Sequence, residues 1–456
     1  MVKNSNIDNI DIERMDKEFV WHPFTQMLDW EKEKNTVIEK GEGVYLYDIY
    51  GNKYIDGVSS LWVNIHGHNN KDINEAVKNQ LAKISHSTLL GLANVPSTIL
   101  AKKLIEIAPK SLAKVFYSDS GSTSVEIAIK VAFQYFRQKG AKYKNKKKFI
   151  AATSAYHGDT IGSVSVGGIG LFHSIYKPLL FETVRIIYPY CYRCPFDLNY
   201  PNCDLYCAKE AEKIIAYYSD QAAALVIEPM IQGAAGMITM PDGYMKRIER
   251  ACKENEILLI LDEVATGFGR TGKMFAAEHE DIKPDIMCLA KGITGGYLPM
   301  AATLFTEEIY EGFLGNYEDN KTFFHGHTYT GNQLAASAGI MSLELFEKNN
   351  LINKIQPLIS HFKDRLSEFR NLDAAGNVRS IGLMGGIELV RNKKTKKPFL
   401  QKDKIGHKVA LKAKEKGVII RPLGDTIVVM PPLIISYEIL DELLGVVYDV
   451  IGNIGK

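Results

Sequence analysis

The chain has 456 residues, of which 46% are hydrophobic and 24% charged, a balance typical of a globular protein with about two or three structural units. A formal net charge of +2 excludes a global electrostatic attraction to nucleic acid or to an anionic membrane. The polar N-terminus does not resemble a secretory signal and no apolar run approaches ~20 residues, so we expect a cytoplasmic protein with no membrane or nucleic-acid partner.

The N-terminal segment, residues 1–70, contains two short alternating runs at 44–48 and 53–56. Alternation with a period of two predicts β-strands, and Tyr50, Gly51 and Asn52 supply a turn between them. We therefore expect a β-hairpin here, and we expect it to pack on a small domain formed by the end of the chain.

The middle of the chain, residues 71–340, alternates short apolar runs with longer helical patterns. Strands are predicted at 114–117, 148–152, 223–227, 258–261 and 285–289. Helices are predicted at 122–138, 208–218 and 244–254. This alternation predicts an α/β domain with a mainly parallel sheet covered by helices on both faces.

The last part of the chain, residues 341–456, has a different pattern. Helices are predicted at 343–370 and 405–416, and strands at 380–390, 418–420 and 426–430. The mixture predicts a smaller α+β domain.

Four of the six cysteines gather in one segment with the pattern CxxC, eight residues, CxxxC. They are Cys191, Cys194, Cys203 and Cys207. Four thiolates can close a tetrahedron around zinc, but the gap between the two pairs is shorter than in a usual zinc ribbon. The alternative that we favour is a surface insertion with reduced, unliganded cysteines, and we expect no metal in the active site.

Ligands of open α/β sheets bind outside the carboxyl ends of the strands, so the residues that follow each predicted strand are candidates for a site. The run SDSGST follows the strand at 114–117. Gly121 lets a ligand approach the backbone, and Ser122 begins a helix whose free N–H groups attract an anion. An ordinary helix cap would have the same composition, so this signal is weak alone.

Two charged residues follow the next buried strands. Asp262 follows the strand at 258–261, and a buried carboxylate there needs a partner, such as a pyridinium N–H or a cation of the fold. Lys291 follows the strand at 285–289 and precedes a glycine-rich run. Burial lowers the pKa of a lysine amine, which makes Lys291 a candidate Schiff-base nucleophile.

A phosphate anchor, an acid for a ring nitrogen and a lysine for an aldehyde are together what a pyridoxal-5′-phosphate (PLP) site requires. The combination is much more specific than any one of the three. Tyr156, after the strand at 148–152, is expected to lie in the same cleft as an aromatic neighbour of the ring or the substrate.

The runs LDEVATGFGRTGKMFAAEHE and LAKGITGG resemble the class III, or ω-type, PLP aminotransferases. The resemblance covers essentially the whole chain and implies a fold-type I architecture and a homodimer with shared active sites. It implies Lys291 as the Schiff-base lysine and Asp262 as the partner of the pyridine nitrogen. It also implies Gly121 and Ser122 at the phosphate and Tyr156 beside the ring and the substrate.

Further motifs are similar to the branch of this family that acts in biotin biosynthesis. They are WHPFTQM, SSLWVNIHGH, SDSGSTSVEIA, YHGDTIGSVSVG and IRPLGDTIVVMPP. That branch transaminates 7-keto-8-aminopelargonate (8-amino-7-oxononanoate) to 7,8-diaminononanoate. The resemblance implies Arg421 as the partner of the substrate carboxylate, which a guanidinium fork suits. It also implies that His327 and Thr328 reach the phosphate across the dimer, with Gly326 near the substrate.

The expected substrate pocket includes Phe24, Leu61 and Trp62. Phe24 stands where many members have tyrosine, and Leu61 where many have tryptophan. The missing hydroxyl and indole leave the amino donor open between S-adenosylmethionine and lysine, and they favour lysine slightly. His327 stands where many members have proline.

Two other positions argue against ornithine, acetylornithine or 4-aminobutyrate as the donor. Relatives that use glutamate carry a glutamate where this chain has Ala234, and an arginine in the stretch that holds Val428 and Val429. Valine cannot replace an arginine that pairs with a substrate carboxylate. The alternatives are another class III ω-transaminase acting on a diamine or amino ketone, and a PLP mutase or racemase. A non-catalytic PLP-binding protein is disfavoured by the intact Lys291 and Asp262.

Overall fold

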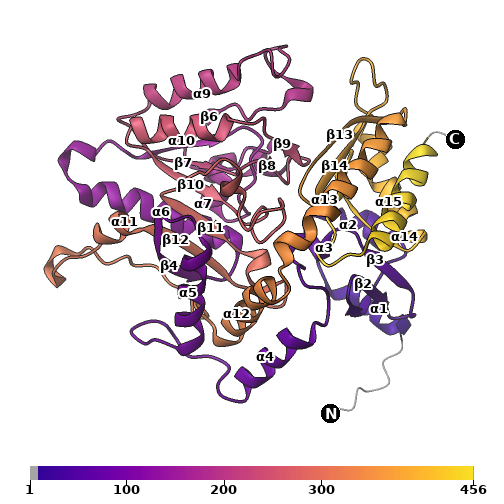
Figure 1. Ribbon diagram of the computed structural model, residues 1–456, viewed down its shortest axis with the longest axis horizontal. Helices are drawn as coiled ribbons and strands as arrows, with labels where there is room; N and C mark the ends of the chain where they lie inside the picture. The colour runs from indigo at the N-terminus through magenta and orange to yellow at the C-terminus, as the bar shows by residue number, and fades with distance from the viewer. Residues whose placement is uncertain (1–8, 455–456) are drawn as a thin grey trace.

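The computed structural model describes residues 9–454. Its centre is a seven-stranded sheet in the order β4, β12, β11, β10, β7, β5, β6 (Figure 1). The strands are β4 (Leu112–Ser118), β12 (Ala301–Thr306), β11 (Ile286–Leu289), β10 (Leu258–Asp262), β7 (Ala222–Ile227), β5 (Lys148–Ala152) and β6 (Thr183–Ile186). Only β12 runs antiparallel to its neighbours in this sheet, so the prediction of a mainly parallel sheet is confirmed.

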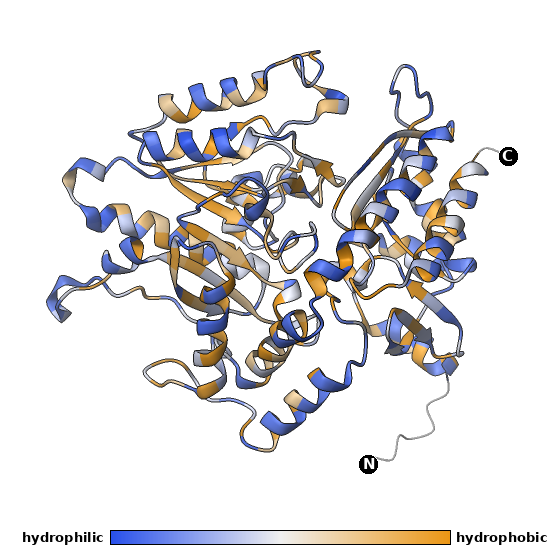
Figure 2. Cartoon of the chain, in the orientation of Figure 1, coloured by the Kyte–Doolittle hydropathy of each residue, from blue (hydrophilic) through white to orange (hydrophobic). Residues whose placement is uncertain are grey.

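Helices cover both faces of the sheet because its side chains alternate between two cores. In β10, Ile260 faces the cluster formed with α6 (Gly121–Lys139), whereas Leu259 and Leu261 face the larger cluster that includes α9 and α10. Figure 2 shows the result as apolar strands between helices whose outer faces are hydrophilic. The other helices of this part are α4 (Lys71–Leu81), α5 (Val95–Ile107), α7 (Ile161–Val166), α8 (Gly170–His173), α9 (Tyr206–Tyr217), α10 (Tyr244–Glu254), α11 (Glu307–Glu311) and α12 (Gln333–Lys348).

The C-terminal part forms an antiparallel sheet in the order β13, β14, β17, β16. Its strands are β13 (Ala375–Ile381), β14 (Met384–Leu389), β17 (Thr426–Val429) and β16 (Arg421–Leu423), and its helices are α13 (Leu351–Glu368), α14 (Ile405–Glu415) and α15 (Tyr437–Gly452). The N-terminal elements are α1 (Asn9–Phe19), α2 (Met27–Lys32), β1 (Ile38–Glu42), β2 (Tyr45–Asp48), β3 (Lys53–Asp56) and α3 (Ser59–Trp62). Strand β15 (Val418–Ile419) pairs in parallel with β3, so the two ends of the chain share a sheet (Figure 1).

Several predicted elements are confirmed, including the hairpin of β2 and β3 and the five strands predicted in the middle of the chain. Two predictions were wrong. The strand expected at 380–390 is the hairpin of β13 and β14, which turns at Gly382 with φ +55°, where a Cβ atom would lie 2.3 Å from the carbonyl oxygen of Arg270. The helix expected at 343–370 is two helices, α12 and α13, separated at Asn350, whose φ is 47°.

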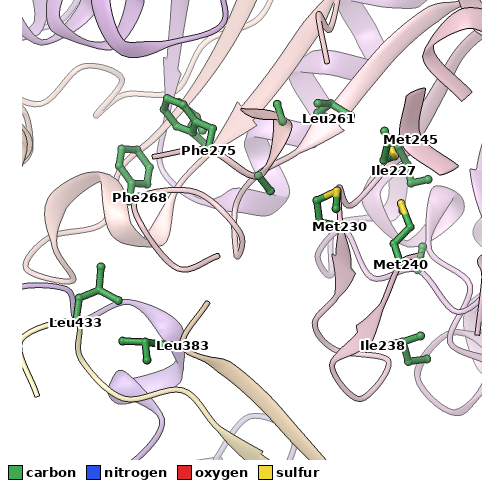
Figure 3. Packing of buried hydrophobic residues seen from close by; sticks show 14 of the residues in the cluster. Ile227, Met230, Ile238, Met240, Met245, Leu261, Phe268, Phe275, Leu383 and Leu433 are labelled. Carbon is green, nitrogen blue, oxygen red and sulfur yellow. The ribbon is translucent and has the colours of Figure 1, made fainter. Parts of the chain in front are cut away.

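A continuous apolar core joins the large sheet to the C-terminal part. Phe268 and Phe275 contact edge to face with ring centroids 5.6 Å apart, and Leu383 and Leu433 lie in the same cluster (Figure 3). This shared core therefore holds the large sheet and the C-terminal part together. Within residues 9–454, no helix combines the length and the apolar character needed to cross a bilayer.

Candidate active site

A cavity of about 410 Å³ opens where β4, β5, β7, β10 and β11 end. Its lining includes six of the residues predicted from the sequence, namely Trp62, Gly121, Ser122, Tyr156, Asp262 and Lys291. The carboxyl ends of neighbouring parallel strands meet at one edge of a sheet, which is why residues far apart in the chain come together here.

Asp262 is held at the bottom of the cavity by two donors. Its Oδ2 atom lies 2.7 Å from Nδ1 of His157, and its Oδ1 atom accepts a hydrogen bond from the backbone N–H of Val264 at 3.0 Å. Both side chains are buried, so the imidazole donates to the carboxylate and fixes its orientation. His157 was not predicted as a site residue, although it follows directly after Tyr156 in a loop at a strand end.

Lys291 follows β11 and is partly buried in the wall of the cavity. Burial lowers the pKa of its amine, which the carboxylates of Asp262 and Glu228 raise. The Nζ atom lies 4.9 Å from the centroid of the Trp62 ring, over its face. The amine is thus directed into the cavity, beside an aromatic wall and opposite two acids.

The helix α6 begins at the rim of the same cavity. Ser120 caps this helix with a reciprocal pair of hydrogen bonds. The Ser120 hydroxyl accepts from the N–H of Thr123, and the Thr123 hydroxyl accepts from the N–H of Ser120. Ser122 accepts a hydrogen bond from the N–H of Asp159 at 3.0 Å. A Cβ atom on Gly158 would lie 2.0 Å from the Ser122 hydroxyl, so only glycine fits there. The start of a helix of 19 residues is an anion site of the expected kind.

Trp62 is held at the cavity by a left-handed turn of the backbone. The four residues of α3, Ser59 to Trp62, all have positive φ angles, between 48° and 70°. Left-handed turns of this kind cost roughly 1–2 kcal/mol per residue, so other contacts must hold them. Asp56 makes the main contacts that hold this turn. Its carboxylate accepts hydrogen bonds from the N–H and the hydroxyl of Ser60, and it lies 2.9 Å from Nε2 of His68.

Two of the predicted substrate residues, Phe24 and Arg421, line a second cavity of about 410 Å³. The ring of Phe24 contacts Phe172 at 5.3 Å, and Phe172 contacts Tyr156 at 6.4 Å, both edge to face. This aromatic chain connects the second cavity to the wall of the first. Tyr156 also donates its hydroxyl to Asp159 at 2.6 Å.

The other predicted residues lie outside both cavities. Leu61 is 47% exposed, next to Trp62. His327 lies beside Asp119 of its own chain, with Nδ1 at 2.7 Å from Oδ2, and Asp119 lines the first cavity. Gly326 and Thr328 belong to the same segment, which lies near the cavity rim through this contact.

Glu228 is the second lining residue that the sequence reasoning missed. It directly follows β7, and its carboxylate accepts hydrogen bonds from the N–H groups of Gly233 and Tyr156. The rule that identified Asp262 and Lys291, a polar residue at a strand end, also applies to Glu228 and could have found it.

The residues present fit a PLP group. Asp262 offers a fixed carboxylate for a ring nitrogen, Lys291 an amine for an aldehyde, and the start of α6 a place for a phosphate. Among residues 9–454, the buried Nε1 atom of Trp62 and Nε2 atom of His157 have no hydrogen-bond partner, and both residues line this cavity. Buried polar atoms without partners are expected where a ligand completes the site.

The cysteine segment lies apart from this cavity. Cys191, Cys194, Cys203 and Cys207 are free thiols around a small cavity of their own, beside the start of α9. No three histidine, cysteine or acidic side chains in the described part of the chain are gathered to hold a metal ion.

Comparison with known proteins identifies the family of the chain. The family model described as aminotransferase class-III matches residues 28–451. A protein of Methanocaldococcus jannaschii named adenosylmethionine-8-amino-7-oxononanoate aminotransferase is 51% identical over 98% of this chain and 99% of its own. A protein of the same name from Aquifex aeolicus is 52% identical, covering 95% of each chain.

Solved structures agree as well. The crystal structure of the M. jannaschii enzyme superimposes with a TM-score of 0.93 at 50% identity, covering 97% of this chain and 99% of that one. An amine transaminase from an uncultivated Pseudomonas species, solved in its PLP-bound form, has a TM-score of 0.91 at 33% identity, with 96% and 99% covered. The chain described here therefore belongs to the class-III aminotransferase family, and it is a PLP-dependent aminotransferase of fold-type I.

Proposed function

We propose that the chain transfers an amino group to 8-amino-7-oxononanoate and so produces 7,8-diaminononanoate in biotin biosynthesis. The observation that carries this proposal is the position of Arg421, exposed in a cavity that an aromatic chain through Phe172 connects to Tyr156. A guanidinium at some distance from the reacting amine suits a long substrate with a terminal carboxylate. The names of the relatives with about 50% identity support the same substrate.

Valine at positions 428 and 429 supports this choice over a substrate whose second carboxylate would need an arginine in that stretch. Val428 lies opposite Arg421 in the pairing of β16 with β17, and both Val428 and Val429 are buried within the described sheet. These positions therefore offer only apolar contacts. An acyl chain suits such a wall, whereas a second carboxylate would lose its hydration there without gaining a partner.

When bound, PLP supplies an aldehyde that takes up the amino group and a protonated ring that withdraws electrons from the reacting carbon. The fixed carboxylate of Asp262 keeps a ring nitrogen protonated. Lys291 holds the cofactor and, when its amine is free, moves a proton at Nζ, acting first as base and then as acid. Burial lowers the pKa of the Lys291 amine, which favours the neutral form that a base requires. One cavity thus serves donor and acceptor in turn.

The amino donor in this proposal is S-adenosylmethionine or lysine. Phe24 and Leu61 favour lysine, because the phenol hydroxyl and the indole that many family members have at these positions are missing. Both side chains are about half exposed, and Phe24 lines the same cavity as Arg421.

A homodimer with shared active sites is part of the same proposal. Five large apolar side chains are more than 60% exposed near the segment 325–328, namely Leu90, Leu92, Val95, Phe324 and Tyr329. A Cβ atom on Gly326 would lie 3.3 Å from the Leu90 side chain, and Tyr329 contacts His86, so these segments form one apolar surface. A second copy on this surface would bring Thr328 of the partner subunit to the phosphate.

The direct test is product identification. The PLP-loaded protein is mixed with 8-amino-7-oxononanoate together with one donor, either lysine or S-adenosylmethionine, and 7,8-diaminononanoate is measured by mass spectrometry. We expect product, with the faster rate from lysine. Conversion of simple diamines or amino ketones with no product from either donor would instead identify another ω-transaminase. Failure of every donor to convert the cofactor to its amino form would indicate a mutase or racemase.

A further inference from the structure

Glu228 occupies a central position in the cavity without an obvious role in binding. It is only 4% exposed and follows directly after β7. Its Oε1 atom accepts a hydrogen bond from the N–H of Gly233 at 3.0 Å, and its Oε2 atom accepts one from the N–H of Tyr156 at 3.4 Å. One carboxylate therefore connects the loop that carries Tyr156 with the turn after β8 (Ile231–Gln232).

The Gly233 turn supports the other walls of the cavity. A Cβ atom on Gly233 would lie 3.2 Å from the Trp62 ring, so the turn packs directly against the aromatic wall over Lys291. The same turn receives Arg379 of β13, which donates to the carbonyl oxygen of Met237 at 2.9 Å. Glu228 thus lies where the large sheet, the aromatic wall and the C-terminal sheet meet.

The charged and titratable groups that face Glu228 come from several elements. They are Asp262 of β10, His157 and Tyr156 of the loop after β5, Tyr188 after β6 and Lys291 after β11. Asp262 has the His157 ring as a direct partner, whereas the hydrogen bonds of Glu228 come from backbone N–H groups alone among the described residues.

We propose that Glu228 is a positioning residue that holds the Tyr156 loop and the Gly233 turn, and that it places a second negative charge in the cavity that Lys291 also lines. The proposal goes beyond the choice of substrate, because it concerns the lysine and the cofactor pocket alone. The two acids of the site then have different roles. Asp262 keeps the ring nitrogen protonated, and Glu228 stabilises the protonated nitrogen of Lys291.

The electrostatics agree with this division. The pKa of Glu228 is raised to about 7, mainly by burial; the charge of Asp262 adds to this rise, whereas His157 and the backbone N–H groups of Gly233 and Tyr156 oppose it. Glu228 therefore gains its charge as the pH rises through neutrality. An ionised Glu228 stabilises the protonated form of the nitrogen of Lys291, so removing that charge makes this nitrogen lose its proton at lower pH.

The test is an absorbance titration of the PLP-loaded protein without substrate, which follows the protonation of the nitrogen that joins Lys291 to the cofactor. In Glu228→Gln, which keeps the size of the side chain, we expect the midpoint to fall by about one pH unit. In Glu228→Asp, which keeps the charge, we expect the midpoint to stay near that of the wild type. Because no substrate is present, a wrong substrate assignment leaves this result unaffected.

Glu263 provides a matched control. It is also wholly buried, also accepts two backbone N–H bonds, from Ala276 and Ala277, and its pKa is also raised by burial to about 7. It does not line the cavity. Glu263→Gln should leave the midpoint unchanged. An unchanged midpoint in Glu228→Gln, or equal shifts in the Gln variants at both positions, would overturn the proposal. If Glu228→Gln does not fold, a shifted midpoint in Glu228→Asp overturns it instead.

Discussion

Three charged side chains, Asp262, Glu228 and Lys291, line one cavity at the carboxyl edge of the sheet, and their partners decide what each can do. His157 and the N–H of Val264 hold Asp262, and the N–H groups of Gly233 and Tyr156 hold Glu228. Lys291 has an aromatic ring and no carboxylate in direct contact among its described contacts. This difference leaves Lys291 the most reactive of these groups, because its ammonium form gains the least from direct contacts.

A prediction at the residue scale concerns Glu263, which supports the loop after β10 from inside the protein. Its pKa in the folded state, about 7, is higher than the 4.5 of an ordinary glutamate, because burial disfavours its charge. The native state therefore holds this proton more tightly than the unfolded state, and ionisation of Glu263 destabilises the fold. The cost is absent below about pH 4.5, grows up to about pH 7 and is constant above that.

Glu263→Gln removes this titration, although it also weakens the bond with Thr266. We expect the stability of the variant relative to the wild type to increase between pH 4.5 and 7, measured as the difference in urea midpoint at each pH. A difference that is constant across this range would contradict the assignment. The constant part of the difference reports the lost hydrogen bonds and carries no information about the charge.

At the scale of single elements, the left-handed turn at Ser59–Trp62 is the feature that hydrophobic patterning could not reveal. Alternation and helical periodicity describe repeating backbone, and a single left-handed turn has no period. Asp56 holds this turn through Ser60 and His68. This left-handed turn places the ring of Trp62 beside the amine of Lys291.

Asp56→Ala should destabilise the protein by about 3 kcal/mol, because buried hydrogen-bonding groups lose their acceptor. It should also release Trp62, which a change in tryptophan fluorescence and weaker PLP binding would report. Asp48→Ala is the matched control, since Asp48 accepts from Tyr50, Asn52 and Tyr54 in the hairpin far along the sheet from the cavity. Equal losses of PLP affinity in both variants would show that the turn has no specific role.

The strand-end rule explains how much of the site could be predicted. Asp262 and Lys291 were identifiable because each follows a short apolar run whose secondary structure is unambiguous. The hairpin at Gly382 could not be predicted, because the turn between its two strands depends on the close approach of Arg270, which is distant in the sequence. The direct partner of Asp262, His157, also depends on tertiary structure, since 105 positions in the sequence separate the two residues.

At the scale of the whole molecule, the exposed apolar surface near the segment 325–328 predicts that two copies of the chain associate. We expect the protein to be a dimer in solution by light scattering, and we expect Phe324→Asp to shift it toward monomer. Phe324 is 81% exposed beside the segment 325–328, and a charge there would oppose burial against a second copy. PLP binding should weaken together with dimerisation, because the partner subunit's Thr328 would no longer reach the phosphate.

Tyr217→Asp is the control for this experiment. Tyr217 is 76% exposed at the end of α9, on the outer layer of helices (Figure 1). It should leave both the mass and the PLP affinity unchanged. A monomeric wild type that binds PLP tightly would contradict the shared site.

The central claim is that Arg421 binds the carboxylate of the substrate, while Lys291 and its neighbours carry out the transfer of the amino group. The most direct measurement follows the cofactor absorbance in a single half-reaction, in wild type and in Arg421→Ala. Each protein is mixed with 7,8-diaminononanoate and with the matching diamine that lacks the carboxylate. We predict that the variant loses about 10- to 100-fold in efficiency with 7,8-diaminononanoate and almost nothing with the diamine. Equal losses with both amines, or no loss with either, would contradict the account.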